Sequence, residues 1–171
     1  MIPLSPAISG KLTWSKIPRS RVYELKLDNE IVGTLRRSGF LSSSFLAETQ
    51  EGRWTFRRAG CLGGAQIVDS ASRQQIATLK SDWRGGGSLT FADGQRFHLQ
   101  SKGWWRPAWS VIAEDGQPVL QAHSREKTVQ VAGVVQPQER LSLLILFAWY
   151  RKLQAEEDAA SAATVAVIVA S

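Results

Sequence analysis

Basic and aromatic residues that could contact an anionic ligand recur where short alternating segments end. Arg36-Arg37 and Arg57-Arg58 each follow such a segment, and the stretch KGWWRP combines indole rings with cations. Each Lys or Arg near an anionic leaflet contributes about 1 kcal/mol, and Trp is enriched at membrane interfaces. The sequence therefore predicts binding of an anionic phospholipid headgroup by Arg36, Arg37, Arg57, Arg58, Lys102, Arg106, Trp104 and Trp105.

The same residues fit other roles. Trp stacking beside Arg also suits single-stranded nucleic acid, and an interaction with another protein is a further alternative. Surface charges more often form a solvated rim that keeps a domain soluble. Large indoles such as Trp83 and Trp109 more often fill the core or plug the end of a barrel than contact a ligand.

Residue types that support catalysis or metal binding are sparse. His98 and His123 are the two histidines, fewer than the three or four ligands of a usual zinc site. Cys61 is the one cysteine, so an intramolecular disulfide and a CxxC site are excluded. Gly85–Ser88 lacks the rest of a phosphate loop, and no GxSxG motif occurs. We expect a non-enzymatic protein without metal or cofactor.

Length and charge indicate one domain with a preference for anionic partners. The 171 residues are long enough for a substantial core, and the net charge is +6. MIPLSPAISG carries neither a basic nor a sustained apolar segment, so no secretory signal is expected. With its single cysteine, the chain fits a cytoplasmic protein that could reach the membrane periphery.

The most apolar stretch is Leu141–Leu153, LSLLILFAWYRKL. A helix that is apolar on every side must be buried, and this run is too short to span a bilayer. We expect a core helix over about residues 138–155, ended in water by Glu156-Glu157-Asp158. The apolar tail, residues 159–171, is expected to form a separate short packed helix or strand.

Short strands with turn signals occupy residues 12–135. Val22–Leu27 and Glu30–Leu35 alternate around Asp28-Asn29, which is a hairpin signal. The remaining expected strands are 12–17, 44–49, 53–57, 66–69, 75–80, 88–91, 96–100, 109–114, 119–123 and 128–134.

An internal repeat limits the number of architectures that the strands could form. Leu35, Leu79 and Leu120 occupy equivalent positions in three hairpins, 44 and 41 residues apart. Propeller blades also repeat every four strands, but three blades are too few and leave no place for a buried helix. About twelve strands can instead close into an antiparallel barrel without edges, whose interior is wide enough for the helix. We therefore expect one all-β domain, 1–171, wrapped around a buried hydrophobic C-terminal helix.

This pattern resembles the tubby C-terminal-like fold, shared by tubby-like proteins, phospholipid scramblases and LURP-one-related proteins. The hairpin Tyr23–Leu35 and the helical stretch Leu144–Tyr150 carry the likeness, which covers about residues 12–155. The resemblance implies the barrel and a binding or scaffold role. Scramblase-type cysteine clusters and acidic calcium loops are absent, so scrambling activity is not implied.

Overall fold

All of the predicted strands form in the computed structural model, which describes residues 1, 4, 11–39, 44–60, 63–83, 86–102, 108–133 and 135–169. Their bounds are β1 Leu12–Lys16, β2 Val22–Leu27, β3 Glu30–Arg37, β4 Phe45–Thr49, β5 Arg53–Ala59, β6 Gly64–Asp69, β7 Gln75–Ser81, β8 Gly87–Phe91, β9 Arg96–Lys102, β10 Ala108–Ala113, β11 Pro118–His123 and β12 Thr128–Val131. One helix, α1, follows at Gln138–Val169.

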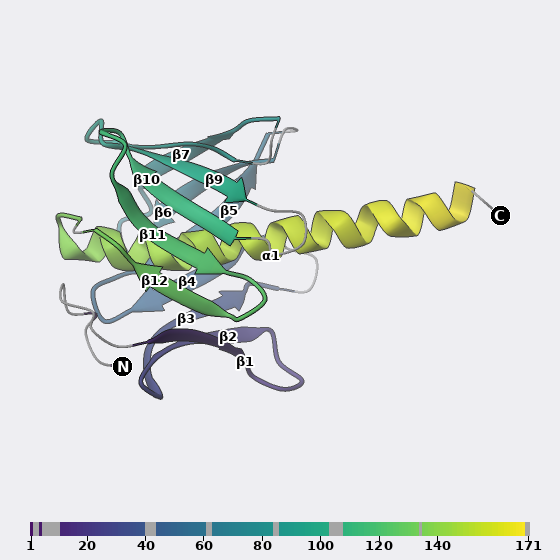
Figure 1. Ribbon diagram of the computed structural model, residues 1–171, viewed down its shortest axis with the longest axis horizontal. Coiled ribbons are helices and arrows are strands. Elements are labelled where there is room, and N and C mark those ends of the chain that lie inside the picture. The colour runs from purple at the N-terminus through teal and green to yellow at the C-terminus, as the bar shows by residue number, and fades with distance from the viewer. Residues whose placement is uncertain are drawn as a thin grey trace.

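The strands form a closed antiparallel barrel in which each strand pairs with its neighbours in sequence. Closure comes from β1, which pairs with β12 through Leu12 opposite Val129 and Thr13 opposite Thr128. Figure 1 shows the strands wrapped around α1. The predicted fold class is confirmed, and closure gives every described strand a paired neighbour on both sides.

Local sequence explains the hairpins. Asp28 and Asn29 adopt φ values of 48° and 77°, the left-handed conformation that two-residue hairpin turns require and that Asp and Asn tolerate. Within each strand, alternate residues face the helix: in β4, Phe45 and Ala47 are buried between partly exposed neighbours. This alternation decides which polar residues at the strand ends also face inward.

The core lies between α1 and the inner face of the barrel. Every residue from Leu143 to Tyr150 is at most 2% exposed, so the helix is enclosed on all sides as its composition requires. Trp14 of β1 stacks on Trp149 with ring centroids 5.0 Å apart and an angle of 10° between planes. Gly33 allows close approach, since a Cβ there would lie 3.3 Å from Cδ2 of Leu146.

The helix is longer than predicted. It does not end near residue 155 but continues through Glu156-Glu157-Asp158 to Val169. The stretch 159–169 is therefore part of α1 and not a separate element. The physical reason is that 138–169 contains no Gly or Pro and is rich in alanine after Gln154. Burial ends at Gln154, and Ala155 is already exposed.

Candidate functional site

Four of the predicted basic residues, Arg36, Arg37, Arg57 and Arg58, lie where α1 leaves the barrel, an end we call the exit rim. In an antiparallel barrel all odd-numbered strands run the same way, so β3, β5, β7 and β9 end at one rim. Ion pairs from β3 and β5 to Glu157 and Asp158 place the departing helix at that same rim. The opposite end, where α1 begins, is the start rim.

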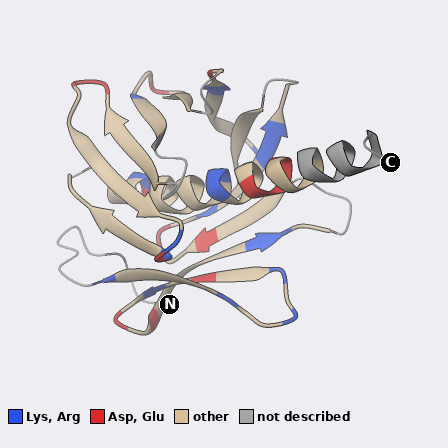
Figure 2. Ribbon diagram, turned by 45° about the vertical axis from the view of Figure 1, so that its right-hand side comes forward, with Lys and Arg blue, Asp and Glu red and all other residues tan. Residues whose placement is uncertain are grey.

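Charge is distributed unequally between the two rims. Figure 2 shows basic ribbon at the strand ends beside the departing helix. The bases at the described strand ends and turns of the exit rim are Lys16, Arg19, Arg21, Arg36, Arg37, Arg57, Arg58, Lys80, Lys102, Arg125 and Lys127, against Asp82 and Glu126. The turns and adjoining strand ends of the start rim hold most of the other acids, namely Asp28, Glu30, Glu51, Asp69, Asp93, Glu114 and Asp115, together with fewer bases, among them Arg53, Arg73 and Arg96. The barrel is thus polarised, with its positive end at the helix exit.

Strand alternation splits each arginine doublet. Leu35 is buried in the core, so Arg37, two residues on, also faces the helix while Arg36 faces outward and is exposed. The same holds in β5, where Phe56 is buried, Arg58 reaches the helix and Arg57 faces outward. The doublets therefore supply both helix contacts and an outer basic surface.

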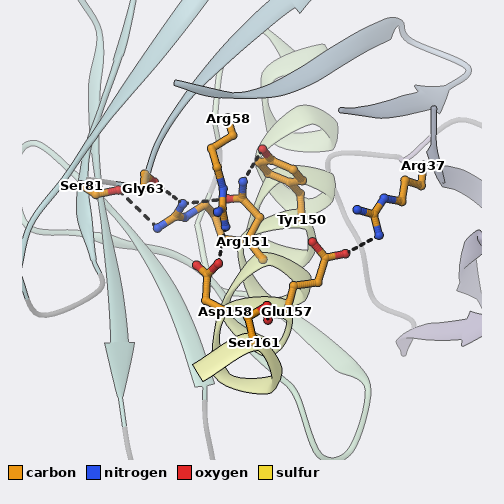
Figure 3. Close-up of polar contacts among 10 residues, drawn as sticks. Arg37, Arg58, Gly63, Ser81, Tyr150, Arg151, Glu157, Asp158 and Ser161 are labelled. Atoms are coloured by element: carbon orange, nitrogen blue, oxygen red, sulfur yellow. Dashed lines mark hydrogen bonds and ion pairs between the residues drawn. The ribbon is translucent and has the colours of Figure 1, made fainter. Parts of the chain in front are cut away.

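The inward arginines neutralise acidic residues of α1. Arg37 Nη1 lies 2.9 Å from Glu157 Oε1, and Arg58 Nη2 lies 2.6 Å from Asp158 Oδ1 (Figure 3). The hydrogen bond from Arg58 to Asp158 raises the pKa of that guanidinium above its ordinary value. Within the helix, Lys152 Nζ pairs with Glu156 at 2.8 Å. Each carboxylate that follows the buried segment thus has a cationic partner.

The outward bases remain available to a ligand. Among the described residues, the side chains of Arg36, Arg57 and Lys80 have no hydrogen-bond or ion-pair partner, and all three are exposed. They stand on β3, β5 and β7, alternate strands about 10 Å apart at the usual spacing. Together they form the outer basic surface of the exit rim.

The other predicted site residues are brought to this rim only in part. Lys102 ends β9, which lies across the barrel mouth from β3 in the closed strand order. Trp104, Trp105, Arg106 and Cys61 lie outside the described residues. Trp83 is 87% exposed, whereas Trp109 is 4% exposed and belongs to the core. Within the described ranges, no group of three His, Cys, Asp or Glu side chains could hold a metal ion.

A buried arginine that sequence reasoning missed lies just inside the exit rim. Arg151 Nη1 donates to the Gly63 carbonyl and to Gln154 Oε1, both at 2.7 Å, and Nη2 donates to Ser81 Oγ at 3.3 Å (Figure 3). Gln154 in turn donates to the Tyr150 hydroxyl at 2.6 Å. Burial lowers the pKa of Arg151.

The role of this network is structural. The Nε atom of Arg151 is buried with no hydrogen-bond partner among the described residues. None of the three hydrogen bonds that Arg151 donates goes to a carboxylate. The network joins α1 to Gly63, in the loop that follows β5, and to Ser81, the last residue of β7. The sequence signal for this network is Arg151 itself, a charged residue that directly follows the apolar run Leu143–Tyr150.

Comparison with known proteins supports the fold alone. The sequence matches no protein-family profile, and no curated protein sequence matches it. Among solved structures it is similar to an X-ray structure of a protein from Arabidopsis thaliana, AT5G01750, with a TM-score of 0.54 and 18% identity. The match covers 85% of this chain and 96% of that chain. In the part of the chain that the structure describes, no helix is both long and apolar enough to cross a bilayer.

Proposed function

We propose that this protein is a non-enzymatic binding module of the tubby C-terminal-like barrel family that docks reversibly on anionic phospholipid. The observation that carries this proposal is the polarity of the exit rim. Bases crowd the strand ends there, and the acids of α1 that would oppose an anionic surface are paired with Lys152, Arg37 and Arg58.

The expected strength follows from the outer basic surface. Arg36, Arg57 and Lys80 are exposed, and each cation near an anionic leaflet contributes about 1 kcal/mol. Such attraction is screened within about 10 Å at 0.1 M salt, so added salt weakens binding. The protein would act at the periphery of a cytoplasmic membrane surface.

The course of α1 supports the same orientation. The helix leaves the barrel at the exit rim and its backbone continues to Val169 (Figure 1). The sequence of its last segment, Ala159–Val169, contains no charged residue. A rim that faces a membrane directs this stretch toward it, and apolar contact adds to the electrostatic attraction.

Co-sedimentation with vesicles tests the proposal. Neutral phosphatidylcholine vesicles are compared with anionic ones at low and moderate salt. The variant Arg36→Ser/Arg57→Ser/Lys80→Ser should lose most binding to anionic vesicles. The matched control, Arg53→Ser/Arg73→Ser/Arg96→Ser, removes the same amount of charge from the start rim and should retain binding to anionic vesicles. Equal loss in both variants, or no binding by the unmodified protein, would refute the proposal.

A second candidate function is single-stranded nucleic-acid binding, favoured by Trp83. The residue is 87% exposed and lies three positions after Lys80, where a base could stack beside phosphate-binding cations. An oligonucleotide titration tests this alternative. Tight, salt-dependent binding that falls in Trp83→Ala, together with no vesicle binding, would favour nucleic acid.

A further inference from the structure

A crevice of about 360 Å³ opens at the exit rim between α1 and the inner face of β1–β4. This volume lies within the range of about 300–1,000 Å³ that is typical of small-molecule sites. One wall is formed by the strands and the other by the helix. Phe45 and Leu153, 3% and 6% exposed, form its apolar floor.

The strand wall presents hydrogen-bond donors. Lys16 of β1 and Tyr23 of β2 are directly opposite in register, with the ammonium 5.8 Å from the centre of the ring. Neither the Lys16 ammonium nor the Tyr23 hydroxyl has a hydrogen-bond or ion-pair partner among the described residues. Arg21 and Arg37 line the same wall and add positive charge, while Arg21 donates to the Gly39 carbonyl and Arg37 pairs with Glu157. This wall suits an anion.

The helix wall presents acceptors. Leu153, Glu156, Glu157 and Ala160 are spaced so that they share one face of α1, and all four line the crevice. A carboxylate has about four acceptor positions, so Glu156 can accept more hydrogen bonds while it pairs with Lys152. The pKa of Tyr23 is raised by burial and then by Glu156 and Glu157, so the field of these carboxylates reaches across the crevice.

We propose that the crevice binds a phosphate ester that carries an ammonium group, supplied by the headgroup of an amine-bearing anionic phospholipid. Lys16 and Tyr23 donate hydrogen bonds to the phosphate, and Glu156 accepts a hydrogen bond from the ammonium. The inference rests on the proposed function and adds selectivity to it. The two carboxylates disfavour a headgroup with several phosphates and no amine, since like charges would then meet at the helix wall.

Vesicles of equal surface charge test this selectivity. Phosphatidylserine and phosphatidylglycerol each carry one net negative charge, but only the former has an ammonium. The unmodified protein should bind phosphatidylserine vesicles about tenfold more tightly, which is the effect of about 1.4 kcal/mol. Glu156→Gln should abolish this preference while retaining salt-dependent binding to both. Tyr23→Phe should weaken both lipids, because each has the phosphate.

Glu126→Gln is the matched control, since it removes a carboxylate from the same rim outside the crevice and should keep the preference. Circular dichroism confirms that each variant is folded. Equal affinity of the unmodified protein for the two lipids, or a preference that survives Glu156→Gln, overturns the inference and leaves the proposed function standing. Absence of binding to any anionic vesicle refutes both.

A titration with soluble headgroup analogues tests whether the crevice binds the lipid or a free phosphate ester. Glycerophosphoserine and glycerophosphoglycerol, which lack acyl chains, are titrated in solution. Weak binding of glycerophosphoserine that is lost in Glu156→Gln, with much tighter binding to vesicles, supports the headgroup assignment. Binding of glycerophosphoserine as tight as that of vesicles overturns the lipid assignment in favour of a soluble ligand.

Discussion

Arg58 Nη2 lies 2.6 Å from Asp158 Oδ1, although the two residues are separated by 100 positions in the sequence. Arg37 and Glu157 form the equivalent pair from β3. The two ion pairs connect the departing helix to β3 and β5, the two strands that flank β4. They also neutralise two acidic residues of α1 beside the basic rim. They leave Arg36 and Arg57 as the outward members of their doublets.

A double-mutant cycle of Arg58→Ala and Asp158→Ala should give a coupling free energy of about 0.2–1 kcal/mol, because exposed ion pairs are weak. The side chains are 36% and 59% exposed, which permits solvent screening. Urea unfolding at low and high salt measures the coupling, which should fall with salt. A coupling well above this range would show that the pair is more shielded than the structure indicates.

Leu144→Asp should abolish folding. Leu144 is 0% exposed inside the barrel, and an unpaired charge there costs several kcal/mol against a total stability of about 5–15 kcal/mol. Far-ultraviolet circular dichroism and size-exclusion chromatography measure the outcome. Ala155→Asp, on an exposed turn of the same helix, is the control and should fold. A folded Leu144→Asp protein would contradict the central-helix architecture.

Arg151→Ala should destabilise the fold by about 2–3 kcal/mol, through lost packing and an unpaired acceptor on Gln154. Arg151→Met keeps most of the volume and removes the cost of a buried charge, so its loss should be at least about 1 kcal/mol smaller. Urea unfolding compares the two, with the exposed Arg57→Ala as control. Equal losses would mean that the hydrogen bonds outweigh the packing.

Alkaline titration should reveal the buried phenol. Burial raises the pKa of Tyr150 to about 12, from an ordinary 10.0. Because the folded state holds this proton more tightly than the unfolded state, its stabilising contribution is complete below pH 10 and is lost as pH rises toward 12. Phenolate absorbance in Tyr23→Phe isolates Tyr150, as the chain has two tyrosines. Ionisation near the ordinary value would contradict its burial.

Truncation after Ser161 should preserve the barrel and weaken vesicle binding. Burial of α1 ends at Gln154, and the pairs of Glu157 and Asp158 are retained. The melting temperature should therefore stay within a few degrees, as expected for a change below about 1 kcal/mol. Thermal unfolding and co-sedimentation measure the two effects. A large drop in melting temperature would show that residues 162–169 stabilise the barrel.

Local patterns in the sequence determined the elements of the fold. Alternation in Val22–Leu27, the Asp28-Asn29 turn and the apolar run within Leu141–Leu153 each encode a conformation over a few residues. An apolar helix without a polar face also requires enclosure, so the closed barrel followed from this run together with the pattern of about twelve short strands. The predicted end of α1 was wrong because Glu156-Glu157-Asp158 was interpreted as the point where the helix stops, although no residue in that stretch breaks a helix.

Tertiary structure decided how the residues of the candidate site are arranged. Sequence placed Arg36, Arg37, Arg57 and Arg58 at strand ends, but the course of α1 decided that one member of each doublet meets an acid. The crevice joins Lys16 and Tyr23 to Glu156, more than a hundred residues later. Such contacts depend on strand register, barrel closure and the axial position of the helix. These are properties of long-range packing, which local composition does not encode.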